Sequence, residues 1–287
     1  MKGRDNLIKA LTSGTEIFPV VIPYLRIFLR DHWDEITHKP WWAIWFPEKI
    51  IEVDEDLHRK LDIDWASCKL CPTREWRKRH KVECYDKKTF LVDTEKGEKI
   101  EIKRPPVGGW VTPIDFNPRI RSEKDLDRIE IPSSRRLIKS GQLDYACMVK
   151  SKFGSSKFVF ASVGSPFWRA LSRYMGLRGT LLGLIRKPSL IKSVIKLVTQ
   201  QVLEEVRAYS KVGVDGIWVE DCLTSADEIS VKHFKKFVLP FVEDVIQEIE
   251  SVKMKSIYHF CGDVHDRLDL LVKTGCDAIA LEESKKS

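Results

Sequence analysis

The sequence predicts an α/β fold in which helices cover a parallel β-sheet. From residue 131 onward, short apolar segments rich in β-branched residues alternate with longer segments of helical periodicity. This alternation is typical of parallel sheets. Polar side chains follow the apolar segments, at the place where the carboxyl ends of parallel strands form active sites. The length of 287 residues allows one large barrel of this class.

The composition limits the class of protein. The chain is 43% hydrophobic and 32% charged, which predicts a sizeable core and a solvated surface and argues against disordered and membrane classes. The net charge of +7 arises from interspersed residues of both signs, so we expect a small anionic substrate or an acidic partner and no nucleic acid. The N-terminus lacks the pattern of a secretory signal, and the seven cysteines lack the spacing of a disulfide framework. We therefore expect a cytoplasmic protein.

The first part of the chain is less regular. A strand is predicted at residues 18–24, because a short β-branched segment is bounded there by turn residues. Residues 41–130 contain six of the nine tryptophans and, at 87–102, two strand-like segments around a polar turn that includes Gly97. We interpret 41–130 as an elaborated insertion that contains a β-hairpin.

Regular βα units are predicted over residues 131–287, and the whole chain, 1–287, is expected to form a single domain. The predicted strands cover residues 157–164, 215–221, 255–260 and 277–282. The predicted helices between and before them cover residues 137–150, 167–177, 189–212, 231–252 and 264–274. The polar residues at the strand ends are Ser165, Glu220, Asp221, His259, Cys261, Glu282 and Glu283.

Three segments in this regular part of the chain resemble consecutive segments of proteins in the uroporphyrinogen decarboxylase superfamily. They are residues 213–221, the His-x-Cys-Gly motif that begins at His259, and residues 274–279. The resemblance extends from about residue 120 to residue 287 and is closer to the branch of methylcobamide:thiol methyltransferases. It implies a TIM-type (β/α)8 barrel. The last strands of such a barrel have no counterpart before Ser287, so we expect a barrel that is incomplete at its C-terminal end.

His259 and Cys261 are the candidate metal ligands. They lie two positions apart at a strand end, so both side chains can project to the same side. Imidazole and thiolate suit Zn²⁺, which lowers the pKa of a bound thiol, and the resemblance implies a zinc enzyme. A third ligand is not identified from the sequence, and the other reading is a buried cysteine beside a hydrogen-bonding histidine. The residues that could contribute a further ligand are Cys276, Cys222, Glu220 and Glu282.

Two further pairs are candidates for catalysis and for substrate binding. Glu220 and Asp221 end a predicted strand, where they could bind substrate or transfer a proton, although such residues also cap helices. Arg26 and Arg30 lie one helical turn apart and could hold a carboxylate, although a solvated helix face is an equal alternative. Family decarboxylases have an Arg-Gln-Ala-Gly-Arg segment at this place. Residues 26–30 keep the spacing of the arginines but not the small residues.

A separate group of cysteines forms a second candidate zinc site. The order Cys-x2-Cys-x8-His-x3-Cys, formed by Cys68, Cys71, His80 and Cys84, could close a tetrahedral structural site. Packed or surface thiols are the more common explanation of such a pattern.

Together these observations predict methyl transfer from a corrinoid, supplied by a partner protein, to a zinc-activated thiol. One alternative is decarboxylation of an anionic tetrapyrrole, which would depend on Arg26 and Arg30. Another is an inactive barrel fragment, or one that a partner completes. The expected substrate is a small thiol or anion, a homodimer is compatible with the sequence, and neither nucleic acid nor membrane is expected as a partner.

Overall fold

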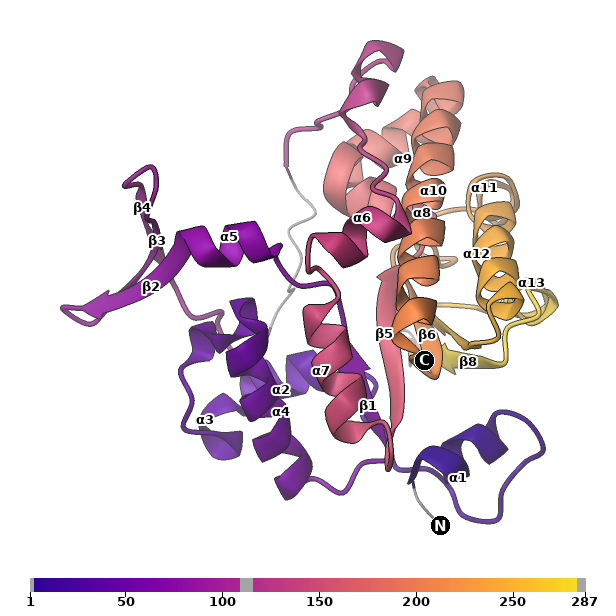
Figure 1. The fold of residues 1–287 in the computed structure, drawn as a ribbon. Helices are drawn as coiled ribbons and strands as arrows, with labels where there is room; N and C mark the ends of the chain where they lie inside the picture. The colour runs from indigo at the N-terminus through magenta and orange to yellow at the C-terminus, as the bar shows by residue number, and fades with distance from the viewer. Residues whose placement is uncertain (1–2, 109–115, 283–287) are drawn as a thin grey trace.

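The computed structural model describes residues 3–108 and 116–282, and its arrangement is shown in Figure 1. Its main sheet has five parallel strands in the order β1-β5-β6-β7-β8. Their bounds are β1 Trp65–Cys68, β5 Phe158–Gly164, β6 Gly216–Asp221, β7 Lys255–Phe260 and β8 Ala278–Leu281. The predicted parallel sheet and four of the predicted strands are confirmed. Within the described residues the sheet is open, with β1 and β8 at its edges.

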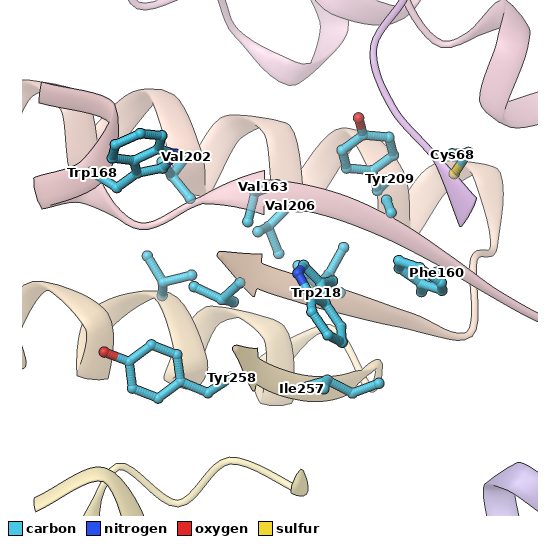
Figure 2. Close-up of a cluster of buried hydrophobic side chains, with 14 of the residues drawn as sticks. Cys68, Phe160, Val163, Trp168, Val202, Val206, Tyr209, Trp218, Ile257 and Tyr258 are labelled. Atoms are coloured by element: carbon cyan, nitrogen blue, oxygen red, sulfur yellow. The ribbon is translucent and has the colours of Figure 1, made fainter. Parts of the chain in front are cut away.

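Helices cover one face of this sheet. The longest, α10 (Pro188–Val212), was predicted closely; it begins with Pro188 and ends at Gly213, whose φ of +78° suits a left-handed helix cap. Its apolar residues recur with helical spacing, and in Figure 2 Val202 and Val206 lie beside Val163 of β5. The buried face of α10 therefore anchors the centre of the sheet.

The remaining helices connect the strands or precede the sheet. Their bounds are α1 Gly3–Ala10, α2 Leu25–Asp31, α3 Trp33–Ile36, α4 Pro47–Lys60, α5 Arg74–Arg79, α6 Ser134–Lys139, α7 Asp144–Phe153, α8 Pro166–Ala170, α9 Gly176–Arg186, α11 Val231–Phe237, α12 Leu239–Ser251 and α13 Leu268–Lys273. Short 3₁₀ segments cover Trp41–Trp45 and Glu123–Arg128, and a π-helical turn covers Leu171–Met175. Within the described ranges, no helix combines the length and apolar character needed to cross a membrane.

The other face of the sheet is lined by aromatic side chains. Trp65 of β1 lies 4.6 Å from Phe160 and 5.7 Å from Trp218, measured between ring centroids. Trp218 in turn stacks on His259 of β7, with centroids 4.7 Å apart. Figure 2 shows Phe160 and Trp218 with Ile257 on this side of the strands. These ring contacts form an aromatic layer that runs from β1 across β5 and β6 to His259 near the end of β7.

A second, antiparallel sheet contains β2 (His80–Tyr85), β3 (Lys88–Asp93) and β4 (Lys99–Ile102). Strands β3 and β4 form the predicted hairpin, and Gly97 in their turn has a positive φ of +71°. The additional strand β2 joins through Asp86 and Lys87, which both have positive φ values, as two-residue hairpin turns require. Figure 1 shows this sheet projecting away from the main body.

The predicted strand at residues 18–24 is wrong. The segment has no strand partner, and Phe18 is 87% exposed. Pro19 and Pro23 lack the N–H groups that a ladder needs. The backbone of Val20 is fixed beside the sheet by two hydrogen bonds of 2.8 Å: its N–H donates to the Asp64 carboxylate, and its carbonyl oxygen accepts from the Asp64 N–H. The edge strand is instead Trp65–Cys68, which lies inside the range interpreted as an insertion.

Several predicted helices are divided in the structure. The helix expected at 137–150 is α6 and α7, separated near Gly141, whose φ is +79°. The helix expected at 231–252 is interrupted at Val238, just before Leu239 and Pro240, and the one expected at 264–274 begins at Leu268. Hydrophobic periodicity runs through these breaks, which explains why the pattern did not reveal them.

Candidate functional site at the ends of β6 and β7

The candidate site lies where β6 and β7 end side by side. Glu220 and His259 are register partners on these parallel strands, so their side chains project from the same face. Cys222 and Cys261 each occupy the second position after these residues and lie on that face as well. The predicted metal ligands His259 and Cys261 are therefore brought together with Glu220, as expected for strand ends.

Cys261 is the centre of the contacts. Its Sγ lies 3.2 Å from Cys222 Sγ, 3.4 Å from Tyr24 Oη and 3.7 Å from His259 Nδ1. Tyr24 Oη also lies 2.8 Å from His259 Nε2. The imidazole is held between Trp218, which stacks on it, and the edge of the Tyr24 ring. These contacts fix the positions of one thiol and one imidazole at the end of the sheet.

The pKa values of the two thiols are shifted in opposite directions. The pKa of Cys261 is lowered to about 7, chiefly by hydrogen bonding with Cys222 and, against burial, with His259. The pKa of Cys222 is raised, because its thiol hydrogen bonds to Cys261 and is buried. When the pair loses one proton, the thiolate therefore forms on Cys261 and the remaining proton stays on Cys222.

Glu220 adds a carboxyl group to this face. Burial raises its pKa, while His259 and Cys222 oppose the shift. Cys222 Sγ lies 3.7 Å from Glu220 Oε1. Glu220 thus places a buried carboxyl group with a raised pKa beside the thiols.

Asp221, the second predicted catalytic residue, lies on the opposite face of β6. Its side chain is fully buried and accepts hydrogen bonds from Ser165 Oγ at 2.7 Å and Tyr258 Oη at 2.6 Å. Burial raises its pKa to about 6, although these hydrogen bonds lower it. The structure separates Asp221 from the surface that carries His259 and Cys261, and places it between strands β5, β6 and β7.

The two predicted substrate-binding arginines have different carboxylate partners. Arg26 Nη1 lies 2.7 Å from Asp54 Oδ1, and its other Nη contacts Tyr145 Oη. Arg30 Nε lies 2.5 Å from Oδ1 of the adjacent Asp31. Each of the two guanidinium groups is therefore paired with its own aspartate within the protein.

The second predicted zinc cluster is not assembled. Cys68 is buried in β1, whereas Cys71 directs its thiol to the carbonyl oxygen of Gly141 at 3.3 Å. His80 begins β2 and stacks on Trp76, and Cys84 is exposed four positions further along that strand. The four side chains have separate surroundings, which agrees with the alternative of packed and surface thiols.

The candidate site can be compared with a zinc site in the type of its donor atoms and in their number. The donor types fit zinc, because an imidazole and a thiol with a lowered pKa meet at the strand ends. The number of ligands does not yet fit: in residues 3–108 and 116–282, no three His, Cys, Asp or Glu side chains are placed to hold a metal ion. Glu283, one of the expected polar strand-end residues, lies outside the described residues.

Tyr24 is a member of the site that sequence reasoning missed. It precedes α2 and is 235 positions away from its partner His259. Its polar neighbours come from the opposite end of the chain, so local periodicity carried no signal for it.

Comparisons with known proteins identify the family. A family model described as uroporphyrinogen decarboxylase (URO-D) matches residues 109–287. A methylcobamide:CoM methyltransferase of Methanosarcina mazei is 20% identical over 164 residues, which cover 57% of this chain and 48% of that protein. A uroporphyrinogen decarboxylase of Chlorobium phaeobacteroides is 23% identical over 175 residues, or 58% of this chain and 49% of that one. The chain thus spans about half the length of these curated relatives.

A solved structure supports the same fold. The structure of a methyltransferase from Methanosarcina mazei superposes with a TM-score of 0.65 at 17% identity, covering 97% of this chain and 75% of that one. The barrel-type α/β class predicted from the sequence is therefore confirmed, although closure of the barrel is not seen in the five described parallel strands. Because the family model covers more than half of the chain, the protein belongs to the uroporphyrinogen decarboxylase family.

Proposed function

We propose that this chain takes part in methyl transfer from a methylcobamide to a small thiol. The observation that carries the proposal is the meeting of Cys261, His259 and Glu220 at the carboxyl ends of two adjacent parallel strands. The names of relatives that transfer methyl groups to coenzyme M supply the substrate class. The corrinoid would be presented by a partner protein.

His259 and Cys261 would hold zinc in this proposal, with Cys222 as the nearest further donor. Bound zinc would lower the pKa of the incoming thiol and so favour the thiolate. The hydrogen bond between Tyr24 and His259 would fix the orientation of the imidazole. Glu220 would accept the proton that the thiol releases, because burial keeps its pKa raised.

The aromatic layer would exclude water from the reacting groups. Trp218 covers one side of His259, and Phe160 and Trp65 continue the apolar surface. A methyl group and a desolvated thiolate react well in such surroundings, because water competes less for the nucleophile. The site thus combines polar groups at one edge with an apolar floor.

The sharpest test is the metal content. Protein purified with zinc supplementation and without chelators should hold nearly one zinc per chain, measured by elemental analysis. The His259→Gln and Cys261→Ser variants should lose it, whereas His38→Ala, which changes an exposed histidine, should not. A wild-type content below about 0.1 zinc per chain would rule out the metal part of the proposal.

The activity is tested with methylcobalamin and coenzyme M as substrates. Wild-type protein should form methyl-coenzyme M, and Cys261→Ser should lower kcat/KM by about 100-fold, or about 2.7 kcal/mol of transition-state stabilisation. Wild-type protein that holds zinc but transfers no methyl group, even with added partner protein, would contradict the assigned reaction.

Decarboxylation of an anionic tetrapyrrole is the second candidate. It is favoured by relatives named uroporphyrinogen decarboxylase that match at 22–23% identity. Such an activity would depend on Arg26 and Arg30 and be insensitive to Cys261→Ser. Carbon dioxide release, measured with paired variants, separates the two reactions.

A further inference from the structure

Two cysteines of the candidate site lie side by side at the ends of neighbouring strands. Cys222 directly follows Asp221 at the end of β6, and Cys261 directly follows Phe260 at the end of β7. Asp221 and Phe260 are register partners, and the N–H of Cys261 donates to the carbonyl oxygen of Asp221 at 3.1 Å. The two strands are therefore still paired at the point where the cysteines leave them.

This spacing matches the needs of a disulfide. Paired strands lie about 4.8 Å apart, and disulfides join Cα atoms separated by about 4.4–6.8 Å. The two Sγ atoms are already 3.2 Å apart and point toward each other. A small rotation of the side chains, without movement of the strands, would bring the sulfurs to bonding distance.

We propose that Cys222 and Cys261 form a redox-active dithiol, which a low-molecular-weight disulfide such as glutathione disulfide converts into an intramolecular disulfide. The proposal is independent of the group that the site transfers. It concerns a covalent state of the protein itself, formed between two side chains that the fold holds in contact.

The reaction proceeds by two exchanges. The sulfur of Cys261 attacks one sulfur of the small disulfide, forms a mixed disulfide and releases one small thiolate. Cys222 then attacks the Cys261 sulfur and releases the second small thiolate. The two protons of the protein thiols pass to the released thiolates, so the protein loses two electrons and two protons, and two small thiols are formed.

The order of attack follows from exposure. Cys261 is partly exposed, whereas Cys222 is only 6% exposed, so an incoming reagent meets Cys261 first. Tyr24 Oη and His259 Nδ1 lie 3.4 and 3.7 Å from its sulfur and supply polar contacts there. Cys222 is then placed as the resolving thiol, because it is the more buried residue and its sulfur lies 3.2 Å from that of Cys261.

The disulfide would close the candidate site. Once Cys261 Sγ is bonded to Cys222, it cannot bind a metal or take part in thiol chemistry. Oxidation would thus switch off whatever reaction uses Cys261, and reduction by a dithiol would restore it.

The test uses the reduced full-length chain, freed of metal and exposed to glutathione disulfide. Free thiols are then blocked with N-ethylmaleimide and the products are mapped by mass spectrometry. The expected product carries no N-ethylmaleimide on Cys222 or Cys261. It contains a peptide pair joined through these two residues, lower in mass by two hydrogen atoms than the two free peptides together. Cys147→Ser, which removes an exposed cysteine, should give the same crosslink.

The Cys222→Ser variant identifies the attacking residue. Without a resolving thiol, it should accumulate one glutathione as a stable mixed disulfide on Cys261, whereas Cys261→Ser should form neither product. Absence of the Cys222–Cys261 crosslink in wild-type protein would overturn the proposal. So would Cys222→Ser protein in which Cys261 carries no glutathione; adducts on the exposed Cys84 and Cys147 do not bear on the pair. Neither measurement uses a methyl donor, so failure here is distinguishable from failure of the proposed transfer.

Discussion

At the scale of single residues, Glu220 and Asp221 show how adjacent carboxyl groups acquire different surroundings. The alternation of a strand sends Glu220 toward His259 and Cys222, and Asp221 toward Ser165 and Tyr258. The sequence places both at a strand end, but it does not reveal which of the two faces the site. Both faces of a parallel sheet are buried, so neither polarity nor periodicity distinguishes them.

Asp221 makes a prediction about stability. Burial raises its pKa from 3.8 to about 6, so the folded state keeps a proton that the unfolded state has already released. The free energy of unfolding should therefore fall by up to about 3 kcal/mol as pH rises from about 4 to about 6. Asp221→Asn should abolish this decline, because it cannot ionise.

The measurement is urea unfolding of wild-type and variant proteins at several pH values between 4 and 8. Asp62→Asn is the matched control, because Asp62 is exposed, and this variant should follow the wild-type curve. Parallel curves for wild-type and Asp221→Asn would show that this carboxyl group does not titrate in that range.

At the scale of elements, strands and their turns were predicted better than helix boundaries. β5, β6, β7 and β8 follow from β-branched segments bounded by turn residues, and α10 follows from a long helical period that ends at Gly213. The strand predicted at residues 18–24 does not form, because an apolar segment becomes a strand only where a neighbouring strand pairs with it. Local composition does not specify that neighbour.

The turn after β7 gives a prediction at this scale. Gly262 has a φ of +92°, and a Cβ atom placed on it would lie 2.6 Å from Ser225 Oγ and 2.8 Å from Ser225 Cβ. Gly213 also has a positive φ, +78°, but a Cβ there meets no atom within 4 Å. Gly213→Ala should cost about 1 kcal/mol from backbone strain alone. Gly262→Ala should cost more, about 2–4 kcal/mol, because steric overlap is added.

Urea unfolding of the two glycine variants at one pH distinguishes strain from overlap. The double variant that combines Gly262→Ala with Ser225→Ala should recover part of the lost free energy of unfolding, because removal of Ser225 Oγ relieves the closer contact. Equal losses at Gly213 and Gly262 would mean that the turn after Cys261 adjusts freely and does not fix the position of that cysteine.

At the scale of the whole molecule, chain topology brings together residues that are distant in sequence. His259 and Cys261 were predicted as a pair, and Cys222 was one of several further donors considered, but Tyr24 required the fold to reveal it. The converse holds for Cys68, Cys71, His80 and Cys84, whose spacing suggested one site. The strand and helix that separate them place each in different surroundings. Spacing predicts a site only where the intervening chain returns to the same place.

A metal ion that binds this assembled site should stabilise the entire fold. Ligands that bind only the folded state raise the free energy of unfolding by RT ln(1 + [L]/Kd), which is about 2.7 kcal/mol at 100 times Kd. Because the donors come from separate strand ends, the unfolded chain lacks this arrangement.

Zinc should therefore raise the Tm of reduced wild-type protein with increasing concentration and leave the Tm of His259→Gln nearly unchanged. His38→Ala should respond like wild type, since His38 is exposed and outside the site. A zinc-dependent rise of the same size in His259→Gln would show that His259 is not a ligand of the metal that stabilises the fold.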